Sequence, residues 1–180
     1  MGNNVYVLEC PETHESLIVD GSFEAEKILA AAEGTRVKGI LQTHGHFDHV
    51  QALPELKETL EVPVYAHPGD DYPIAIDVEL ADGDTVPFGN REVTVLHTPG
   101  HTPGGVCFLI GQHLIAGDTL FPGGPGNTWS NKENFDRIIE AISSKLFTLP
   151  GSTRVYPGHG ADTTIGVEKP HLREWIDRGW

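Results

Sequence analysis

Residues 43–49, Thr-His-Gly-His-Phe-Asp-His, concentrate side chains that could bind metal ions. Four of these seven residues are potential ligands: His44, His46, Asp48 and His49. Imidazole nitrogen and carboxylate oxygen suit divalent zinc, iron or manganese. Ligands on one face of a helix would be three or four residues apart, so the two-residue spacing of the first pair indicates a loop. Such a loop can point His44 and His46 one way and Asp48 and His49 another, which predicts two metal ions side by side.

The predicted strands explain how these side chains would be positioned. Residues 37–42 form an apolar run typical of a buried β-strand, and the histidine-rich loop begins where that strand ends. Three further candidates, His101, Asp118 and His159, each follow another predicted strand. Side chains at the ends of strands would gather along one edge of a sheet structure, so we expect all of these residues at a common edge.

The remaining pattern predicts alternating strands and helices in two similar halves. Strand-rich stretches joined by hairpins indicate two sheets packed face to face with helices outside, and the whole chain, residues 1–180, is predicted to be one domain. Strands are predicted at 5–10, 16–19, 37–41, 62–66, 85–88, 91–97, 106–110, 113–116 and 153–156, and helices at 24–33, 53–60, 133–146 and 168–178, with irregular segments at 67–84 and 121–130.

Composition narrows the class of function. The formal net charge is −14, and such a surface repels nucleic-acid phosphates and anionic lipid, so we expect neither a nucleic-acid nor a membrane partner. The N-terminal residues do not show the basic segment followed by an apolar segment that a secretory signal has, which predicts a cytoplasmic location. Cys10 and Cys107 lie in apolar runs without a second cysteine nearby, so both are interpreted as buried free thiols. Oligomeric state leaves no signal in the sequence.

The motifs resemble those of the metallo-β-lactamase superfamily over essentially the whole chain. They are His-x-His-x-Asp-His at 44–49, Pro-Gly-His at 99–101, Gly-Asp-Thr at 117–119 and Pro-Gly-His at 157–159. The segments at 43–49 and 116–121 are most similar to the glyoxalase II group of thioester hydrolases. The resemblance implies a four-layer αββα sandwich with a binuclear centre at its edge. It assigns His44, His46 and His101 to one metal, Asp48, His49 and His159 to the other, and Asp118 to a bridging position.

This resemblance implies a metal-dependent hydrolase that binds two divalent metal ions. Zinc is expected, with iron and manganese as alternatives. A water molecule shared by two cations loses a proton near neutral pH, and the resulting metal-bridging hydroxide would attack a thioester or a related acyl bond. Asp48 could accept a proton from the attacking water besides acting as a ligand. The expected partner is therefore a small-molecule acyl substrate.

Three positions depart from the glyoxalase II pattern and bear on the substrate. Asn127 stands where that group carries a basic residue, Trp129 replaces a tyrosine, and Ala161 lies where Glu-Tyr follows the last histidine. Because these positions supply contacts to glutathione in that group, the three residues are predicted to contact substrate here. We therefore rank a general thioester or ester hydrolase ahead of a hydroxyacylglutathione hydrolase.

Other functions of the same fold stay open at this stage. The segments at 145–150 and 156–159 are similar to persulfide dioxygenases, which bind one iron at the positions of His44, His101 and Asp118. A lactonase shares the pattern of seven ligands. A non-catalytic metal-binding domain ranks last, because all seven ligand positions are intact.

Overall fold

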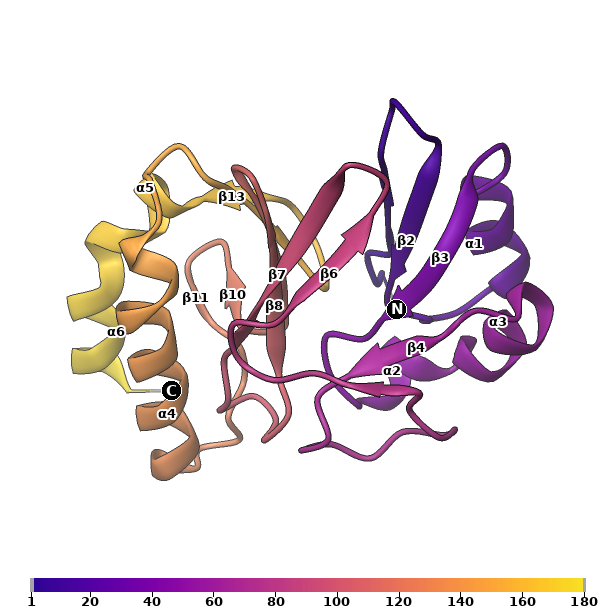
Figure 1. Ribbon diagram of the computed structural model, residues 1–180. Coiled ribbons are helices and arrows are strands. Elements are labelled where there is room, and N and C mark those ends of the chain that lie inside the picture. The colour runs from indigo at the N-terminus through magenta and orange to yellow at the C-terminus, as the bar shows by residue number, and fades with distance from the viewer. Residues whose placement is uncertain (1, 180) are drawn as a thin grey trace.

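The computed structural model describes residues 2–179 and contains two main β-sheets that face each other (Figure 1). The first sheet has the strand order β1-β2-β3-β4-β5. Only β1 and β2 are antiparallel, whereas β2, β3, β4 and β5 run parallel. Its strands are β1 (Tyr6–Glu9), β2 (Glu15–Val19), β3 (Arg36–Leu41), β4 (Val64–Ala66) and β5 (Val78–Glu79).

The second sheet comes from the later half of the chain and has the order β13-β12-β9-β8-β7-β6. Its strands pair antiparallel except for β9 and β12, which are parallel. They are β6 (Thr85–Phe88), β7 (Arg91–His97), β8 (Val106–Ile110), β9 (His113–Gly117), β12 (Arg154–Pro157) and β13 (Thr163–Thr164). A separate two-stranded ladder joins β10 (Leu120–Phe121) to β11 (Gly124–Pro125).

Strand alternation builds three apolar layers from these sheets. Successive side chains of a strand point to opposite faces. Leu17 and Val19 of β2 therefore pack into the core between the sheets, while Ile18 packs on the opposite face, in the apolar cluster shared with the helices outside the first sheet. In the same way, Phe108 of β8 enters the core between the sheets, and Cys107 faces the helices on the other side. Both faces of each sheet are therefore covered.

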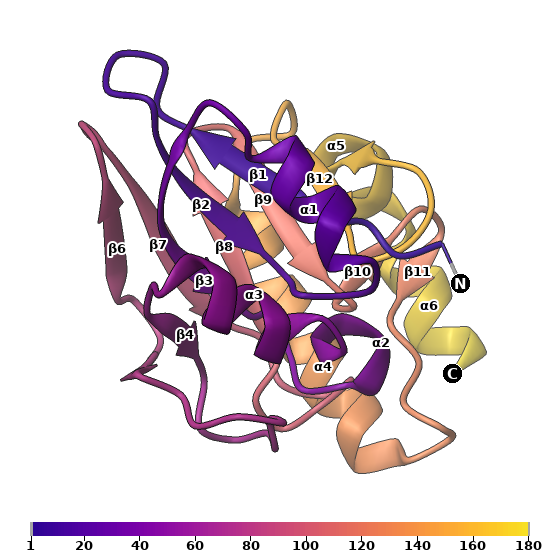
Figure 2. The same cartoon turned by 90° about the vertical axis from the view of Figure 1, so that its right-hand side faces the viewer.

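Helices form the two outer layers. α1 (Ala25–Ala31) and α3 (Leu53–Leu60) cover the first sheet, and α4 (Lys132–Ser144) and α6 (Leu172–Arg178) lie outside the second, as Figures 1 and 2 show. Shorter elements are α2 (Phe47–Val50), η1 (Leu146–Thr148), α5 (Ile165–Glu168) and η2 (Lys169–His171). The predicted αββα sandwich is confirmed. None of the helices in residues 2–179 combines the length and apolar character needed to span a bilayer.

Three local predictions were wrong. Residues 168–178 are not one helix, because Pro170 lacks an N–H and cannot continue an α-helical hydrogen-bond ladder, so the chain passes through η2 before α6 begins. Residues 121–130 are not wholly irregular, because β10 and β11 pair there. The motif at 44–49 is not wholly a loop: His46 is extended, and Asp48 and His49 lie on α2.

Candidate metal centre

The ends of parallel strands bring the predicted ligands to one edge of the sandwich. The histidine-rich loop follows β3 in the first sheet. In the second sheet, β9 and β12 are parallel, so Asp118 after β9 and His159 beyond β12 leave at the same edge. β7 and β9 are both antiparallel to β8 and therefore point the same way, which places His101, in the loop after β7, at that edge too. The seven residues thus meet, as the sequence predicts.

These side chains form three overlapping groups, in each of which the potential ligand atoms lie within 4.8 Å of one another. One group is His44, His46 and His101, and another is Asp48, His49 and His159. They coincide with the two ligand sets that the family resemblance implies. The third group contains His44, His49 and Asp118, so Asp118 lies between the other two.

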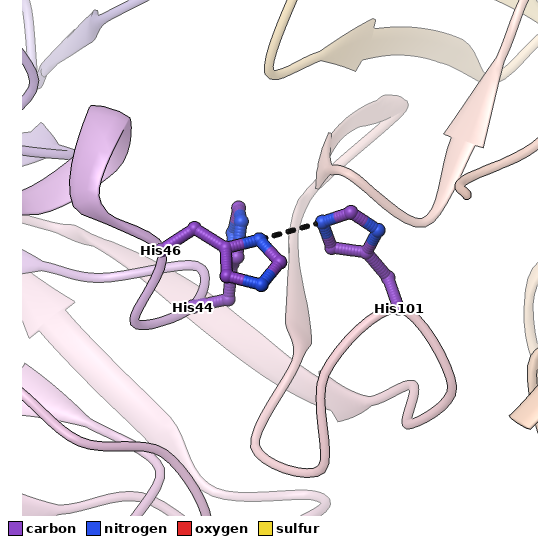
Figure 3. A group of neighbouring side chains, drawn as sticks. All are labelled: His44, His46 and His101. Carbon is purple, nitrogen blue, oxygen red and sulfur yellow. Dashed lines mark hydrogen bonds between the residues drawn. The ribbon is translucent and has the colours of Figure 1, made fainter. Parts of the chain in front are cut away.

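In the first group, two loops from opposite sheets face each other. His44 and His46 come from the loop after β3 and His101 from the loop before β8, and their rings converge (Figure 3). Nε2 of His101 and Nδ1 of His46 are 2.9 Å apart. His101 Nε2 is also 3.5 Å from the Asp118 carboxylate.

In the second group, a carboxylate lies beside two imidazoles. Nε2 of His159 is 3.2 Å from Asp48 Oδ2 and 3.2 Å from Nε2 of His49. Asp118 is close to both rings, at 3.5 Å from His49 and 3.6 Å from His159. Asp48 is held by the Asn3 side-chain amide, which donates to its carboxylate and its backbone carbonyl, each at 3.0 Å.

Neighbouring residues hold the outer nitrogen of three rings. The Thr43 hydroxyl donates its hydrogen to Asp20. Toward His44 it must therefore be the acceptor, and Nδ1–H of His44 donates to it over 3.0 Å. Nδ1 of His49 lies 2.7 Å from an Asp20 oxygen, and Nδ1 of His101 lies 2.9 Å from the Asn127 carbonyl oxygen. Because each outer nitrogen donates, the neutral form of each ring carries its lone pair on Nε2, directed into the centre. Metal-binding histidines have this arrangement.

Burial and charge separate the pKa values of these groups. Burial and neighbouring imidazoles hold the pKa of His44 well below its usual range, and burial lowers that of His101 to about 4. Both rings are thus neutral and able to bind a cation. Burial opposes the charged form of His49, but Asp20 and the other carboxylates outweigh it and raise the pKa to about 9. Burial raises the pKa of Asp118 to about 6.

The inward-facing atoms fit a bound cation. Nε2 of His44 and Oδ1 of Asp118 are buried and have no hydrogen-bond partner among the described residues. A buried polar atom without a partner is costly, and a metal ion would satisfy both atoms. Space is also kept open there, because a Cβ atom at Gly158 would lie 2.7 Å from the His49 ring and closer still to Asp118.

Sequence reasoning missed three residues that support the centre. Asp20, directly after β2, accepts from Thr43 N–H and the Thr43 hydroxyl at 2.8 and 2.9 Å and holds His49. Asn3 holds Asp48. Asp70 joins two ligand loops by accepting from the backbone N–H of Gly45 and Gly104 at 2.9 and 2.7 Å. Only Asp20 left a signal, because it is a carboxylate at the end of a buried strand; the other two lie far from the motifs in sequence.

The three predicted substrate contacts occupy different positions. The Trp129 ring centroid is 5.1 Å from that of His101 and 5.4 Å from that of His46. Asn127 supports this loop, since its side-chain oxygen accepts from the Trp129 backbone N–H at 2.7 Å. Ala161 is exposed beyond β12. The structure therefore places Trp129 beside the metal centre and gives Asn127 a role in shaping its loop.

The fold and the site together define a metal-binding hydrolase class built on an αββα sandwich. The family model described as the metallo-beta-lactamase superfamily matches residues 1–159. The chain therefore belongs to the metallo-β-lactamase superfamily, as its motifs predict.

Curated relatives within this superfamily include proteins named as hydrolases. The chain is 34% identical to a probable metallo-hydrolase, YqgX, of Bacillus subtilis, over 86% of this chain and 84% of the relative. It is 30% identical to a probable polyketide biosynthesis zinc-dependent hydrolase, PksB, of the same species, over 91% of this chain and 76% of the relative. It is also 34% identical to a hydroxyacylglutathione hydrolase of Rhodospirillum rubrum, covering 87% of this chain and 62% of that longer enzyme.

Solved structures show the same fold. ETHE1 from Myxococcus xanthus superposes with a TM-score of 0.87 at 29% identity, over 95% of this chain and 78% of that protein. A di-iron-bound form of TTHA1623 gives a TM-score of 0.81 at 35% identity, over 93% and 92% of the two chains. One relative is named as a probable zinc-dependent hydrolase and one solved structure is of a di-iron-bound form, so both zinc and iron are associated with proteins of this fold.

Proposed function

We propose that this protein is a binuclear metallohydrolase that cleaves a thioester or a related ester of a small acyl substrate. The observation that carries the proposal is the pair of buried inward-facing atoms, His44 Nε2 and Asp118 Oδ1, that have no hydrogen-bond partner among the described residues. The similarity to a hydroxyacylglutathione hydrolase supports the acyl-transfer chemistry. Zinc is the proposed metal, with iron or manganese as alternatives.

In this proposal the two histidine groups hold two ions. His44, His46 and His101 would hold one, and Asp48, His49 and His159 would hold the other, with Asp118 between the two groups. When bound, the two cations would supply Lewis-acid chemistry, by lowering the pKa of a water molecule and polarising the substrate carbonyl. The overall reaction adds water across the acyl–sulfur bond, so that the acyl carbon gains the oxygen and the sulfur leaves as a thiol.

The protein's own residues orient the ligands and manage protons. The Asp20 carboxylate and the Asn127 carbonyl fix which nitrogen of His49 and His101 faces the centre. Burial opposes the charged form of Asp48, but the Asn3 amide and nearby imidazoles outweigh it and lower the pKa. Asp48 thus stays a carboxylate near neutral pH, as a ligand and proton acceptor must. A thiolate leaves readily, so the site needs no dedicated general acid.

The test is substitution of ligands from the two loops. His46→Ala and Asp118→Ala should each abolish thioester hydrolysis and lower the metal content measured by elemental analysis. His171→Ala provides the control, because that exposed histidine on η2 belongs to none of the three ligand groups and its Nδ1 lies 3.3 Å from a Glu174 carboxylate oxygen. Unchanged activity and metal content in either ligand variant would refute the assignment.

A substrate panel separates this proposal from other functions of the fold. Purified protein with measured metal content should hydrolyse thioesters faster than lactones. A single iron per chain, together with oxygen consumption on a glutathione persulfide, would replace the proposal with a persulfide dioxygenase. Turnover of lactones without turnover of thioesters would favour a lactonase. Metal binding without any turnover would indicate a non-catalytic domain.

A further inference from the structure

The aromatic side chains beside the metal centre and the charges around it bear on the choice of substrate. Resting on the proposed hydrolase function, we propose that the centre selects uncharged thioesters or esters with an aromatic or apolar group, held against Trp129, over those carried on an anionic thiol. Three independent features of the described residues carry this inference: the conformation of Trp129, the position of Phe47, and the pairing of the basic side chains.

Trp129 is exposed, yet its conformation is defined by local contacts. Its side chain is 59% exposed, although its ring lies beside both His46 and His101. Its backbone has φ = 51°, a left-handed conformation that a bulky residue rarely adopts. The Asn127 side chain holds that conformation by accepting from the Trp129 N–H. A large apolar ring presented to solvent at a predicted metal centre is typical of a surface that packs on a ligand.

Phe47 adds a second exposed apolar surface next to the ligands. It lies between His46 and Asp48 in sequence, is the first residue of α2, and is 68% exposed. Its ring packs edge-on against that of Phe23, with centroids 6.2 Å apart, so its orientation is supported. Both Phe47 and Trp129 therefore present aromatic surface from segments that also carry or contact predicted ligands.

The basic side chains pair with residues other than the predicted ligands. Apart from Arg178 at the end of α6, each lysine and arginine of the described chain bonds to a residue that is not a predicted ligand. Lys145, for example, bonds to Asp82 and to the His97 carbonyl, and Arg137 bonds to Glu133 on α4. None of these pairs joins a lysine or arginine to Trp129, to Phe47 or to a predicted ligand.

Carboxylates are instead concentrated at the centre. Asp48 and Asp118 are predicted ligands, Asp20 holds His49, and Asp70 holds the loops around Gly45 and Gly104. Two divalent cations would carry four positive charges, equal to the four negative charges of these carboxylates, so no excess positive charge would be left to attract an anionic carrier. With a net charge of −14 on the whole chain, an anionic carrier would approach against the field of the protein.

The decisive experiment compares thioesters that share one acyl group. The D-lactoyl thioester of N-acetylcysteamine is uncharged, whereas that of glutathione is anionic. We expect kcat/KM to be at least tenfold higher for the uncharged thioester at low salt, with the ratio falling as ionic strength rises, because salt screens the repulsion. A phenylacetyl thioester of N-acetylcysteamine should be a better substrate than its acetyl counterpart.

Variants then test the aromatic surface. Trp129→Ala should lower kcat/KM for the phenylacetyl thioester about tenfold while leaving the metal content unchanged, and Trp129→Phe should keep most of the activity. Ile176→Ala is the matched control, since Ile176 is an exposed apolar side chain on α6. A non-hydrolysable thioether analogue of the phenylacetyl substrate should quench tryptophan fluorescence in the parent protein but not in Trp129→Phe.

The outcomes distinguish this inference from the proposed function. Equal or faster turnover of the glutathione thioester would overturn the selectivity and leave the hydrolase proposal intact. No turnover of any thioester by metal-loaded protein would overturn the hydrolase proposal. Fluorescence quenching that persists in Trp129→Phe would overturn the assignment of Trp129 as the contact surface.

Discussion

At the scale of residues, hydrogen bonds outside the predicted ligand set determine which imidazole nitrogens face the centre. Asp20 is central to this arrangement, because its carboxylate accepts from Thr43 N–H and the Thr43 hydroxyl and holds Nδ1 of His49. Thr43 in turn orients His44. One buried carboxylate therefore orients a histidine of each group.

Asp20→Asn should weaken metal binding. The amide oxygen can still accept from Thr43 N–H, but the amide N–H₂ would face Nδ1–H of His49, so two donors would meet. Loss of such a supporting partner typically lowers metal affinity by about 10–100-fold. We expect a shift of that size in competition with a chelator, while circular dichroism stays unchanged.

Asp162→Asn is the control for that substitution, since Asp162 is an exposed carboxylate paired only with Arg154 among the described residues. Parent-like metal affinity in Asp20→Asn would show that the ring of His49 is oriented by packing alone.

The ligands and their supports differ in how visible they are in the sequence. His44, His46, Asp48 and His49 are adjacent in one motif, so their chemistry could be predicted. Asn3 is 45 residues from Asp48, and only the fold brings the two together. The role of Asn127 also depends on backbone conformation, because its carbonyl, not its side chain, contacts His101.

At the scale of elements, a single side chain joins the two loops that bring His46 and His101 together. Asp70 accepts from Gly45 N–H on the loop after β3 and from Gly104 N–H on the loop before β8. The two loops belong to opposite sheets, so this carboxylate ties them together beside the first group of histidines, in addition to the backbone hydrogen bond from Val106 N–H to the Thr43 carbonyl oxygen.

Asp70→Ala should loosen both loops. Two part-buried N–H donors would lose their partner, at a cost of about 1–3 kcal/mol for each donor that stays unsatisfied. We expect a lower melting temperature together with weaker binding of one of the two metal ions, measured by calorimetric metal titration. Asp71→Ala is a matched control, because the neighbouring side chain is exposed and carries the same charge. An equal effect of both substitutions would attribute the change to charge alone.

Gly100 tests how the loop of His101 packs against α4. It has φ = 140°, and an added Cβ would lie 2.7 Å from the Asn134 carbonyl oxygen. Gly100→Ala should therefore lower the free energy of unfolding in chemical denaturation more than Gly111→Ala does. Gly111 also has positive φ, at 57°, but open space around it, so its substitution should cost about 1–2 kcal/mol from backbone strain alone. Equal losses would contradict a close approach of loop and helix.

Elements with regular hydrophobic patterns were predictable, and those set by contacts were not. α3 begins and ends where Pro54 and the apolar spacing predict. β10 and β11 are two residues each and pair only because the chain turns after Asp118. The helix predicted at residues 168–178 is interrupted at Pro170. The helical segment begins earlier than predicted, at Ile165 of α5, so Pro170 lies beyond the first turn, where a proline cannot continue an α-helix.

At the scale of the whole molecule, the candidate metal centre links the two halves of the sandwich. His44, His46, Asp48 and His49 follow β3 of the first sheet, while His101, Asp118 and His159 follow strands of the second. Each proposed ion would therefore join residues from both sheets. Because the site forms only when the sheets are packed together, bound metal should stabilise the folded chain and not the unfolded one.

Metal removal should accordingly lower the melting temperature of the protein. A cation at one hundred times its dissociation constant stabilises the folded state by about 2.7 kcal/mol, which corresponds to roughly 5–10 °C for a chain of this size. Chelator-treated protein should melt lower by at least that interval in calorimetry, and titration with zinc should restore the parent value progressively. Asp118→Ala should show a smaller response to zinc, because the residue between the two groups is lost. A melting temperature independent of metal in the parent protein would mean that apolar packing alone holds the two sheets together, and that the edge residues contribute chemistry without contributing stability.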